Sequence, residues 1–224
     1  MIPGTTLLLG DSITVGLKSY VSADGGVRDI AKGGQTSDWL LGQVRAAEQR
    51  GELSDVSNAV VLIGTNDVGG PATVDHILQN IHKIWTILGQ AGARVFAMTI
   101  PPFNGWQTYA PSWDVKRHAV NDALRAFDVR GTRYSSEFVV GVVDLARLLA
   151  DPSDPDKLAR EHDSGDHLHP RKDRLGSLIT TEVERIMSEK AHRARTRATL
   201  SAAAGVAALG LATWLGYHLW KSRY

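Results

Sequence analysis

Cysteine is absent from the 224 residues of the chain. Disulfide bonds, thiolate metal sites and a cysteine nucleophile are therefore excluded, although the absence does not fix the cellular compartment. Aromatic residues are sparse at 7%, while 43% hydrophobic and 22% charged residues give the ordinary composition of a globular protein. This composition excludes a disordered, collagen-like or low-complexity chain, and the length predicts one full domain with a short addition.

Acidic residues are missing from the last part of the chain. All 24 Asp and Glu residues precede Lys190, together with 19 of the 25 Lys and Arg residues. An acidic body is therefore followed by a basic tail, and we expect the two to behave as separate objects. Because the body carries no basic stripe, we expect no nucleic-acid partner.

Charged residues other than one histidine are also missing from residues 198–220. As a helix, these 23 residues would extend about 34 Å, enough to cross a hydrocarbon core of about 30 Å. Trp214, Tyr217 and Trp220 gather at one end, where such rings favour a membrane interface. A buried or surface-lying helix fits less well because the run has no polar face. We predict a body at 1–189, a basic juxtamembrane linker at 190–197, a transmembrane helix at 198–220 and a short basic tail at 221–224.

The predicted span suggests an orientation and a pairing surface. Four basic residues precede the span and two follow it, which favours a C-terminal, single-pass anchor with the body on the cytoplasmic side. This orientation rule does not apply if the membrane belongs to a virion. Small residues recur every four positions and form a ridge that would let two helices pair, although an Ala-rich helix also yields this spacing by chance. The ridge consists of Ala204, Ala208, Ala212 and Gly216.

The body alternates short apolar segments with helical patterns. Near-continuous apolar runs predict strands buried on both faces at residues 5–9, 27–31, 59–63, 94–100 and 138–145. Apolar spacing and capping residues predict helices at 37–50, 74–88, 113–129 and 171–190. Residues 151–156, with two prolines, predict a polar loop. The alternation predicts an α/β fold in which helices cover both faces of a parallel sheet.

Polar residues follow the predicted strands at their carboxyl ends, where sites form in such sheets. The segment Gly10-Asp11-Ser12 follows the first strand, and residues 33–37 (Gly-Gly-Gln-Thr-Ser) follow the second. Residues 64–67 (Gly-Thr-Asn-Asp) follow the third, and residues 166–170 (Asp-His-Leu-His-Pro) precede the last body helix. A serine, backbone amides, a side-chain amide and an Asp/His pair are the groups that acyl transfer needs.

These four blocks, in this order, resemble those of the SGNH (GDSL-type) hydrolases. They extend from Gly10 to Pro170 and cover the body but not the tail. The resemblance implies a three-layer α/β/α sandwich with a five-stranded parallel sheet of flavodoxin-like type, and an esterase activity without a cofactor. The chain departs from the family pattern at His167, where a glycine is common. The Gly-x-Ser-x-Gly elbow is absent, which argues against the α/β-hydrolase fold.

The chemistry of acyl transfer assigns roles within these blocks. Ser12 is the predicted nucleophile and His169 the general base, because imidazole has a pKa suited to neutral pH. Asp166, three residues earlier, can bond the other ring nitrogen and orient the imidazole. By the resemblance, the oxyanion donors are the backbone N–H groups of Ser12 and Gly34 and the side-chain amide of Asn66.

The same loop permits a different interpretation. His162, His167 and His169 lie among Asp163 and Asp166, a cluster that could also hold a metal. We expect no metal, because the Asp-x-x-His-Pro block already accounts for two members. His167 is the weaker candidate for the base, since only His169 has the aspartate three residues before it and the proline after it.

Other titratable residues are expected to have no catalytic role. Asp11 and Asp67 are expected to hold their loops by side-chain-to-backbone hydrogen bonds. His76, His82 and His118 lie in helical patterns and are expected at or near the surface.

Aromatic residues after the fourth predicted strand are candidates for substrate contacts. Phe103, Trp106 and Trp113 are candidates for lining an acyl or sugar pocket, although packing of a loop is the favoured interpretation. The sequence predicts a membrane-anchored serine ester hydrolase acting on lipid or lysolipid esters or on O-acetyl groups of cell-wall glycans, with thioesters as a third option. The rival hypothesis is a catalytically idle binding or structural module displayed on a cellular or viral membrane.

Overall fold

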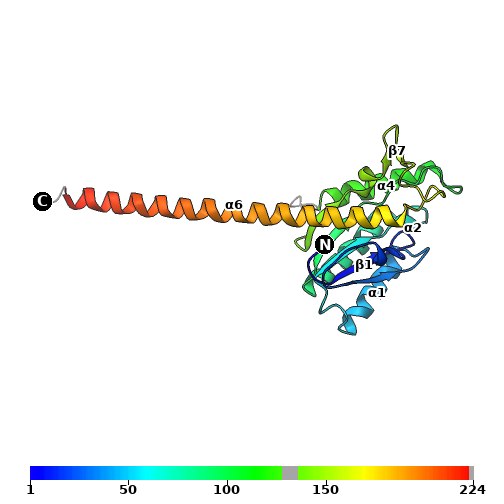
Figure 1. Cartoon of the computed structure of the whole chain (residues 1–224), viewed down its shortest axis with the longest axis horizontal. Helices are drawn as coiled ribbons and strands as arrows, with labels where there is room; N and C mark the ends of the chain where they lie inside the picture. Colours follow the sequence, from blue (N-terminus) through cyan, green and yellow to red (C-terminus); the bar gives the residue numbers. More distant parts are fainter. Residues whose placement is uncertain (128–135, 222–224) are drawn as a thin grey trace. The chain divides into compact units, whose positions relative to one another are not determined.

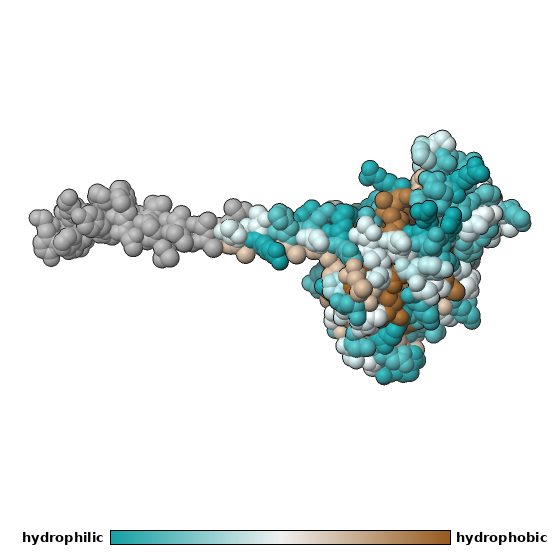
Figure 2. Space-filling view, in the orientation of Figure 1, coloured by the Kyte–Doolittle hydropathy of each residue, from teal (hydrophilic) through white to brown (hydrophobic). Residues whose placement is uncertain are grey.

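The computed structural model describes residues 1–127 and 136–221, with side chains as far as residue 199. The chain divides into two compact units, Met1–Glu184 and Arg185–Tyr224. The first unit contains all the strands that the structure describes (Figure 1). The surface in view in Figure 2 is mainly hydrophilic and shows hydrophobic residues only in small patches, as expected where the apolar side chains form a core.

A five-stranded parallel sheet with the order β2-β1-β3-β4-β5 forms the centre of the first unit. This is the flavodoxin-like strand order. Every residue of the neighbouring strands β1 and β3 is buried, as their continuous apolar runs predict. The five strands match the predicted ones to within two residues and are β1 (Thr6–Gly10), β2 (Val27–Ala31), β3 (Asn58–Leu62), β4 (Arg94–Met98) and β5 (Val139–Val143).

Helices cover both faces of this sheet. The helical elements are η1 (Leu17–Ser19), α1 (Ser37–Gln49), α2 (Thr65–Val68), α3 (Val74–Gln90), α4 (Pro111–Arg125), α5 (Leu145–Leu148) and α6 (Lys172–Lys221). Buried residues of α1, α3 and α4 share one core cluster with Leu7, Val61 and Val95 of the sheet. The alternate strand residues, such as Leu8 and Phe96, are buried on the opposite face of the sheet. Because right-handed crossovers place α1, α3 and α4 on one face, η1 and the start of α6 cover the other face. The predicted α/β class with a five-stranded parallel sheet is confirmed.

The segment at 151–156 differs from the predicted polar loop. It contributes to a small antiparallel hairpin of β6 (Ala150–Asp151) and β7 (Asp154–Leu158). The hairpin is fixed from outside, because the backbone N–H of Asn104 donates to the carbonyl oxygen of Asp156 at 2.8 Å. Proline is common in loops but is also tolerated in edge strands. The composition alone therefore did not distinguish a loop from this hairpin.

Helix boundaries also differ in places. Helix α4 begins at Pro111, a residue favoured in the first turn, rather than at the predicted Trp113. The predicted end of that helix, at 129, lies outside the described residues. Helix α6 continues without interruption through the predicted linker at 190–197, so this basic segment is helical.

The predicted span at 198–220 lies mostly outside the described side chains, although the helical backbone of α6 reaches Lys221. The ridge of small residues lies in the same part of the chain. Within the described residues, the structure contains no helix with the length and apolar character needed to traverse a bilayer.

Candidate active site

The turn after β1 presents Ser12 at the carboxyl edge of the sheet. The buried Asp11 holds this turn, since its Oδ1 accepts the backbone N–H of Ile13 at 3.0 Å and its carbonyl oxygen accepts that of Thr14 at 3.1 Å. Gly10 is required at the strand end, because a Cβ there would lie 2.2 Å from the carbonyl oxygen of Leu62. The side chain of Ser12 is half-buried at this edge.

The loop at 163–170 places an imidazole against this serine. Nε2 of His169 lies 2.8 Å from Oγ of Ser12, and Nδ1 lies 2.6 Å from Oδ2 of Asp166. The other carboxylate oxygen of Asp166 accepts the backbone N–H groups of Leu168 and His169 at 3.0 and 2.8 Å. The structure therefore joins the three residues predicted as nucleophile, base and orienting acid in one continuous chain of hydrogen bonds.

The charge of Asp166 is stabilised within this loop. Partial burial works to raise the pKa of its carboxyl group, but the hydrogen bonds from the backbone and imidazole of His169 outweigh it. The pKa of Asp166 therefore lies well below its usual range, and the group is ionised at neutral pH. An ionised carboxylate at this position favours a proton on Nδ1 of His169, which leaves Nε2 free to accept a proton from the serine.

Lys172 is a site residue that the sequence did not reveal. Its ammonium group donates to the carbonyl oxygens of Ser12 at 2.9 Å and of Ile13 at 2.6 Å. Burial lowers the pKa of Lys172. The lysine thereby ties the first turn of α6 to the nucleophile turn. Its proximity to Pro170 was a usable signal, but nothing in the sequence indicated where its side chain points.

The three predicted oxyanion donors come from three segments. The backbone N–H groups of Ser12 and Gly34 have no hydrogen-bond partner within the described residues. Gly34 adopts a φ of +72°, which favours glycine, and a Cβ added to the neighbouring Gly33 would lie 3.9 Å from the Cβ of Ser12. The amide of Asn66 donates one hydrogen to the carbonyl oxygen of Gln35 at 2.8 Å, which orients it and leaves its second N–H available.

Asp67 anchors two of these segments to each other. Its carboxylate accepts the backbone N–H of Ser37 at 2.9 Å and the Ser37 hydroxyl at 2.6 Å. Burial raises the pKa of Asp67, and these hydrogen bonds oppose the shift. Helix α2, which follows β3, is thereby fastened to the start of α1. Asp11 and Asp67 thus both make the side-chain-to-backbone bonds expected of them.

Asp11 lies fully buried beneath the nucleophile turn. Desolvation raises the pKa of its carboxyl group to about 6, with the hydrogen bond from Ile13 opposing the shift. A carboxyl group that titrates near pH 6 is therefore built into the turn that carries Ser12.

The remaining histidines occupy other environments. Nδ1 of His167 lies 2.5 Å from Oδ2 of Asp163, so this imidazole has its own carboxylate partner and does not share that of His169. His76 is exposed and pairs with Asp38. The candidate metal cluster in the described residues lies elsewhere and consists of Asp114, His118 and Asp156. Arg117 forms ion pairs with both of those carboxylates and offsets their charge.

The aromatic residues after β4 both pack and line a pocket. Phe103, Tyr109 and Trp113 contact one another with ring centroids 6.2 to 6.5 Å apart, and Trp106 lies 6.0 Å from Trp113. Packing was the favoured interpretation of these rings, and the structure adds a mainly apolar pocket of about 150 Å³. The pocket is lined by Thr65, Asn66, Gly69, Phe103, Trp106, Trp113 and Leu168.

The fold and these contacts define a serine hydrolase with a flavodoxin-like strand order, in which a serine, an imidazole and a carboxylate are hydrogen-bonded in series. The model of the GDSL-like lipase/acylhydrolase family matches residues 8–173, so the chain belongs to this family and is an ester-hydrolysing serine hydrolase. The resemblance of the four blocks to those of the SGNH (GDSL-type) hydrolases is confirmed.

Several solved structures share this fold. A GDSL-like lipase from Bacteroides thetaiotaomicron is 18% identical, with a TM-score of 0.64 over 81% of this chain and 88% of that chain. A lipase/acylhydrolase from Enterococcus faecalis is 21% identical, with a TM-score of 0.57 over 80% and 95%. A psychrotrophic esterase from Pseudoalteromonas sp. is 17% identical, with a TM-score of 0.53 over 84% and 99%. A comparison with curated proteins gives no match.

Proposed function

We propose that Ser12, His169 and Asp166 hydrolyse carboxylic esters through an acyl-serine intermediate. Oγ of Ser12 attacks the ester carbonyl carbon while Nε2 of His169 takes the hydroxyl proton. The tetrahedral intermediate then expels the alcohol, which receives that proton from His169, and a water molecule repeats the sequence to release the acid. The hydrogen-bond series from Oγ through the imidazole to Asp166 is the observation that carries this proposal.

The oxyanion formed in each half of the reaction needs donors. The backbone N–H groups of Ser12 and Gly34 and the amide of Asn66 supply them in this proposal. The two backbone groups make no other hydrogen bond in the described residues, which supports such a role. Asn66 also lines the aromatic pocket, so the group that would hold the oxyanion adjoins a place for the acyl chain.

A covalent probe tests the nucleophile. A fluorophosphonate should label the wild-type protein on Ser12, and Ser12→Ala should abolish labelling. Ser177→Ala is the matched control, because Ser177 is exposed on α6 and its hydroxyl only donates to the carbonyl oxygen of Asp173. Labelling of Ser12→Ala as strong as that of the wild type would refute the assignment. An unlabelled, inactive wild type would favour the idle binding or structural module.

The aromatic pocket supports a short acyl group. An apolar cavity of about 150 Å³ holds a molecule of the size of benzene, and this pocket has about that volume. We therefore place acyl groups of up to about six carbons there, which favours acetyl and other short esters, including O-acetylated glycans, over long-chain lipid or lysolipid esters.

Chain-length profiles test the acyl pocket. A Cβ on Gly69 would lie 3.5 Å from the Trp113 ring, an ordinary contact, so Gly69→Ala should narrow the pocket without strain. We expect Gly69→Ala to shift the preferred p-nitrophenyl ester toward acetate, and Trp106→Ala to shift it toward longer chains. Gly42→Ala is the control, because a Cβ there meets nothing within 4 Å. Identical profiles for all variants would place the acyl group elsewhere.

We also propose that residues 198–220 anchor the enzyme in a membrane, with the body on the cytoplasmic side. The uncharged run, its basic flanks and its terminal aromatic residues support this proposal. After alkaline carbonate extraction, the full chain should stay in the membrane pellet, while a chain ending at Glu189 should be released. Release of the full chain would contradict the anchor, and protease protection of the body in sealed cells tests the orientation.

The ridge of small residues supports pairing of two such helices. We expect Ala208→Leu and Ala212→Leu together to abolish cross-linked dimers of the membrane-bound chain. The control is Leu209→Ala, which alters the helix outside the ridge. Unchanged cross-linking would show that the ridge spacing arises from composition alone.

A further inference from the structure

A second pocket, of about 390 Å³, adjoins the loop that carries His169. Consecutive residues of this loop line different spaces: His167 lines the second pocket, while Leu168 lines the acyl pocket. The segment that follows β4 divides in the same way, since Gly105 lines the second pocket and Trp106 lines the acyl pocket. The second pocket is therefore within reach of a group on the same substrate molecule.

The two acidic residues of this pocket, Asp163 and Asp151, accept hydrogen bonds from their own loops. Oδ1 of Asp163 accepts the backbone N–H groups of Gly165 and His167 at 2.8 and 3.0 Å, and its Oδ2 pairs with the His167 imidazole. Oδ1 of Asp151 accepts both the backbone N–H and the hydroxyl of Ser153. Asp163 is only 10% exposed, so its carboxylate serves the loop rather than the pocket.

The basic residues of the pocket are much less engaged. The exposed guanidinium group of Arg160 has no partner within the described residues. Lys157 has a single long ion pair, with Asp154 at 3.3 Å. The His167 imidazole is 61% exposed and bonds Asp163 through Nδ1, which leaves Nε2 available. Arg160, Lys157 and His167 therefore offer hydrogen-bond donors to a ligand, and the first two carry a full positive charge.

The backbone at His167 is strained. Its φ of +62° makes it the one non-glycine residue with positive φ among the described residues. Strained backbone persists where the surroundings hold it and concentrates at binding and catalytic sites. The glycine that is common at this position in the resembling family would adopt this φ freely, so an imidazole here calls for a use of its side chain.

We propose that this pocket binds an anionic group of the substrate, a phosphate or a carboxylate, through Arg160, Lys157 and His167. The proposal rests on the ester hydrolysis proposed above, because the anionic group and the scissile ester belong to one molecule. Arg160 makes the charge-assisted contact, since guanidinium groups match the geometry of such oxyanions. The enzyme then selects short-chain esters of acidic alcohols or acidic sugars.

Matched ester pairs test the pocket and distinguish its two possible anions. The phosphate pair is 1-acetylglycerol 3-phosphate and 1-acetylglycerol, and the carboxylate pair is 3-acetoxypropanoate and 3-acetoxypropanamide. We expect the wild type to favour the anionic member of at least one pair in kcat/KM. Arg160→Gln should reduce that preference about tenfold, which corresponds to the loss of one hydrogen bond to a charged group. His167→Asn and Lys157→Gln should each reduce it by a smaller factor.

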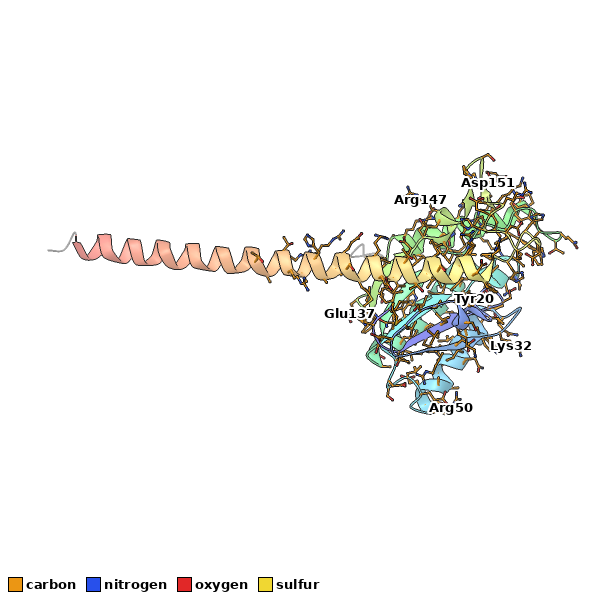
Figure 3. All side chains as sticks on the ribbon, in the orientation of Figure 1. Tyr20, Lys32, Arg50, Glu137, Arg147 and Asp151 are labelled. Atoms are coloured by element: carbon orange, nitrogen blue, oxygen red, sulfur yellow. The ribbon has the colours of Figure 1, made fainter. Side chains whose placement is uncertain are left out.

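Arg50→Gln is the matched control. Figure 3 shows Arg50 and Asp151 at opposite ends of the domain, so this substitution removes a guanidinium group far from the pocket. We expect Arg50→Gln to keep the wild-type preference. Equal preferences in the wild type and Arg160→Gln would overturn the proposal even if both variants hydrolyse esters.

A binding measurement separates this proposal from the catalytic one. Inorganic phosphate is titrated into the wild type, Arg160→Gln and Arg50→Gln and followed by calorimetry. We expect saturable binding to the wild type and Arg50→Gln, and about tenfold weaker binding to Arg160→Gln. Binding that is identical in all three proteins would overturn the anion pocket. An enzyme that binds phosphate in this way but hydrolyses no ester would refute only the proposed activity.

Discussion

Two Asp–His pairs lie side by side in the loop at 163–169, and they are built in opposite ways. In the pair Asp166–His169, the carboxylate is 49% exposed and the imidazole 29%. In the pair Asp163–His167, the carboxylate is 10% exposed and the imidazole 61%. The first pair therefore turns its imidazole inward to Ser12, and the second turns its imidazole outward to a pocket.

This contrast shows that an aspartate bonded to a histidine does not by itself define a catalytic pair. Both carboxylates accept backbone N–H groups of their own loop and bond Nδ1 of their histidine. The difference is the group that Nε2 meets. Nε2 of His169 lies 2.8 Å from a hydroxyl, whereas the exposed imidazole of His167 lines the second pocket together with Lys157 and Arg160.

The largest expected effect separates the two imidazoles. We expect His169→Gln to lower kcat for a neutral short-chain ester by about 10⁴-fold or more, because the base that deprotonates the nucleophile is lost. His167→Gln should cost far less, since no reacting atom meets its side chain. Steady-state kinetics on p-nitrophenyl acetate measure both. Equal losses from the two substitutions would remove the distinction between the pairs.

The next largest effect on kcat should distinguish the carboxylates of Asp166 and Asp163. Asp166→Asn should reduce kcat by about 10³- to 10⁴-fold, because an amide no longer fixes the imidazole tautomer or stabilises the imidazolium. Asp163→Asn retains an oxygen for the backbone N–H groups and should act mainly on the preference for anionic esters. Kinetics on the acetate ester, with circular dichroism to check folding, measure the effect. A loss below tenfold in Asp166→Asn would mean that another group orients His169.

The loop at 163–169 shows which features of the site could be predicted from the sequence and which could not. The roles of Asp166 and His169 could be expected because their spacing forms a recognisable block, and the buried strands could be expected because parallel strands are continuous apolar runs. The opposite exposure of the two imidazoles could not be expected, because it depends on the φ of His167 and on the packing of this residue against Gly105. The spacing of three residues marks Asp166 and His169 as the block of the family, but neither this spacing nor the four residues from Asp163 to His167 shows which group each imidazole faces.

Long-range contacts account for the other features that the sequence did not predict. The hairpin of β6 and β7 has two prolines and the composition of a loop, and its backbone bond to Asn104 comes from a segment some fifty residues away. Lys172 lies in a predicted helix, but its bonds to the carbonyl oxygens of Ser12 and Ile13 depend on how the start of α6 packs against the turn after β1. Burial of a single charged side chain has no periodic pattern that a sequence displays.

The next effect concerns the free energy of unfolding and the buried carboxyl group of Asp11, beneath the nucleophile turn. The pKa of Asp11 is raised to about 6 by burial, so its contribution to stability is present below about pH 4 and lost as pH rises to about 6. The cost of the buried charge above pH 6 is about 3 kcal/mol. Asp11→Asn keeps an acceptor for the Ile13 N–H and should be more stable than the wild type at pH 8 by up to that amount.

Urea denaturation at pH 4 and pH 8 measures this difference. The advantage of Asp11→Asn should shrink at pH 4, where Asp11 is protonated in the folded state. A constant difference at both pH values would show that Asp11 does not titrate in this range. Asp67→Asn provides a comparison, because burial also raises the pKa of Asp67 but hydrogen bonds from Ser37 oppose the shift.

The smallest effect concerns whether His167 contributes to folding. We expect His167→Asn to change the free energy of unfolding by less than about 1 kcal/mol, because asparagine tolerates positive φ and exposed ion pairs contribute little. His167→Val should destabilise by about 1 to 3 kcal/mol, because a β-branched residue does not fit that backbone. Urea denaturation near neutral pH measures both. If His167→Asn destabilises the protein as much as His167→Val, the imidazole stabilises the loop through Asp163, and the strain at this position no longer argues for a ligand. If the stability of His167→Asn matches that of the wild type, the outward-facing pair contributes little to the fold, and its function must lie in the pocket that it lines.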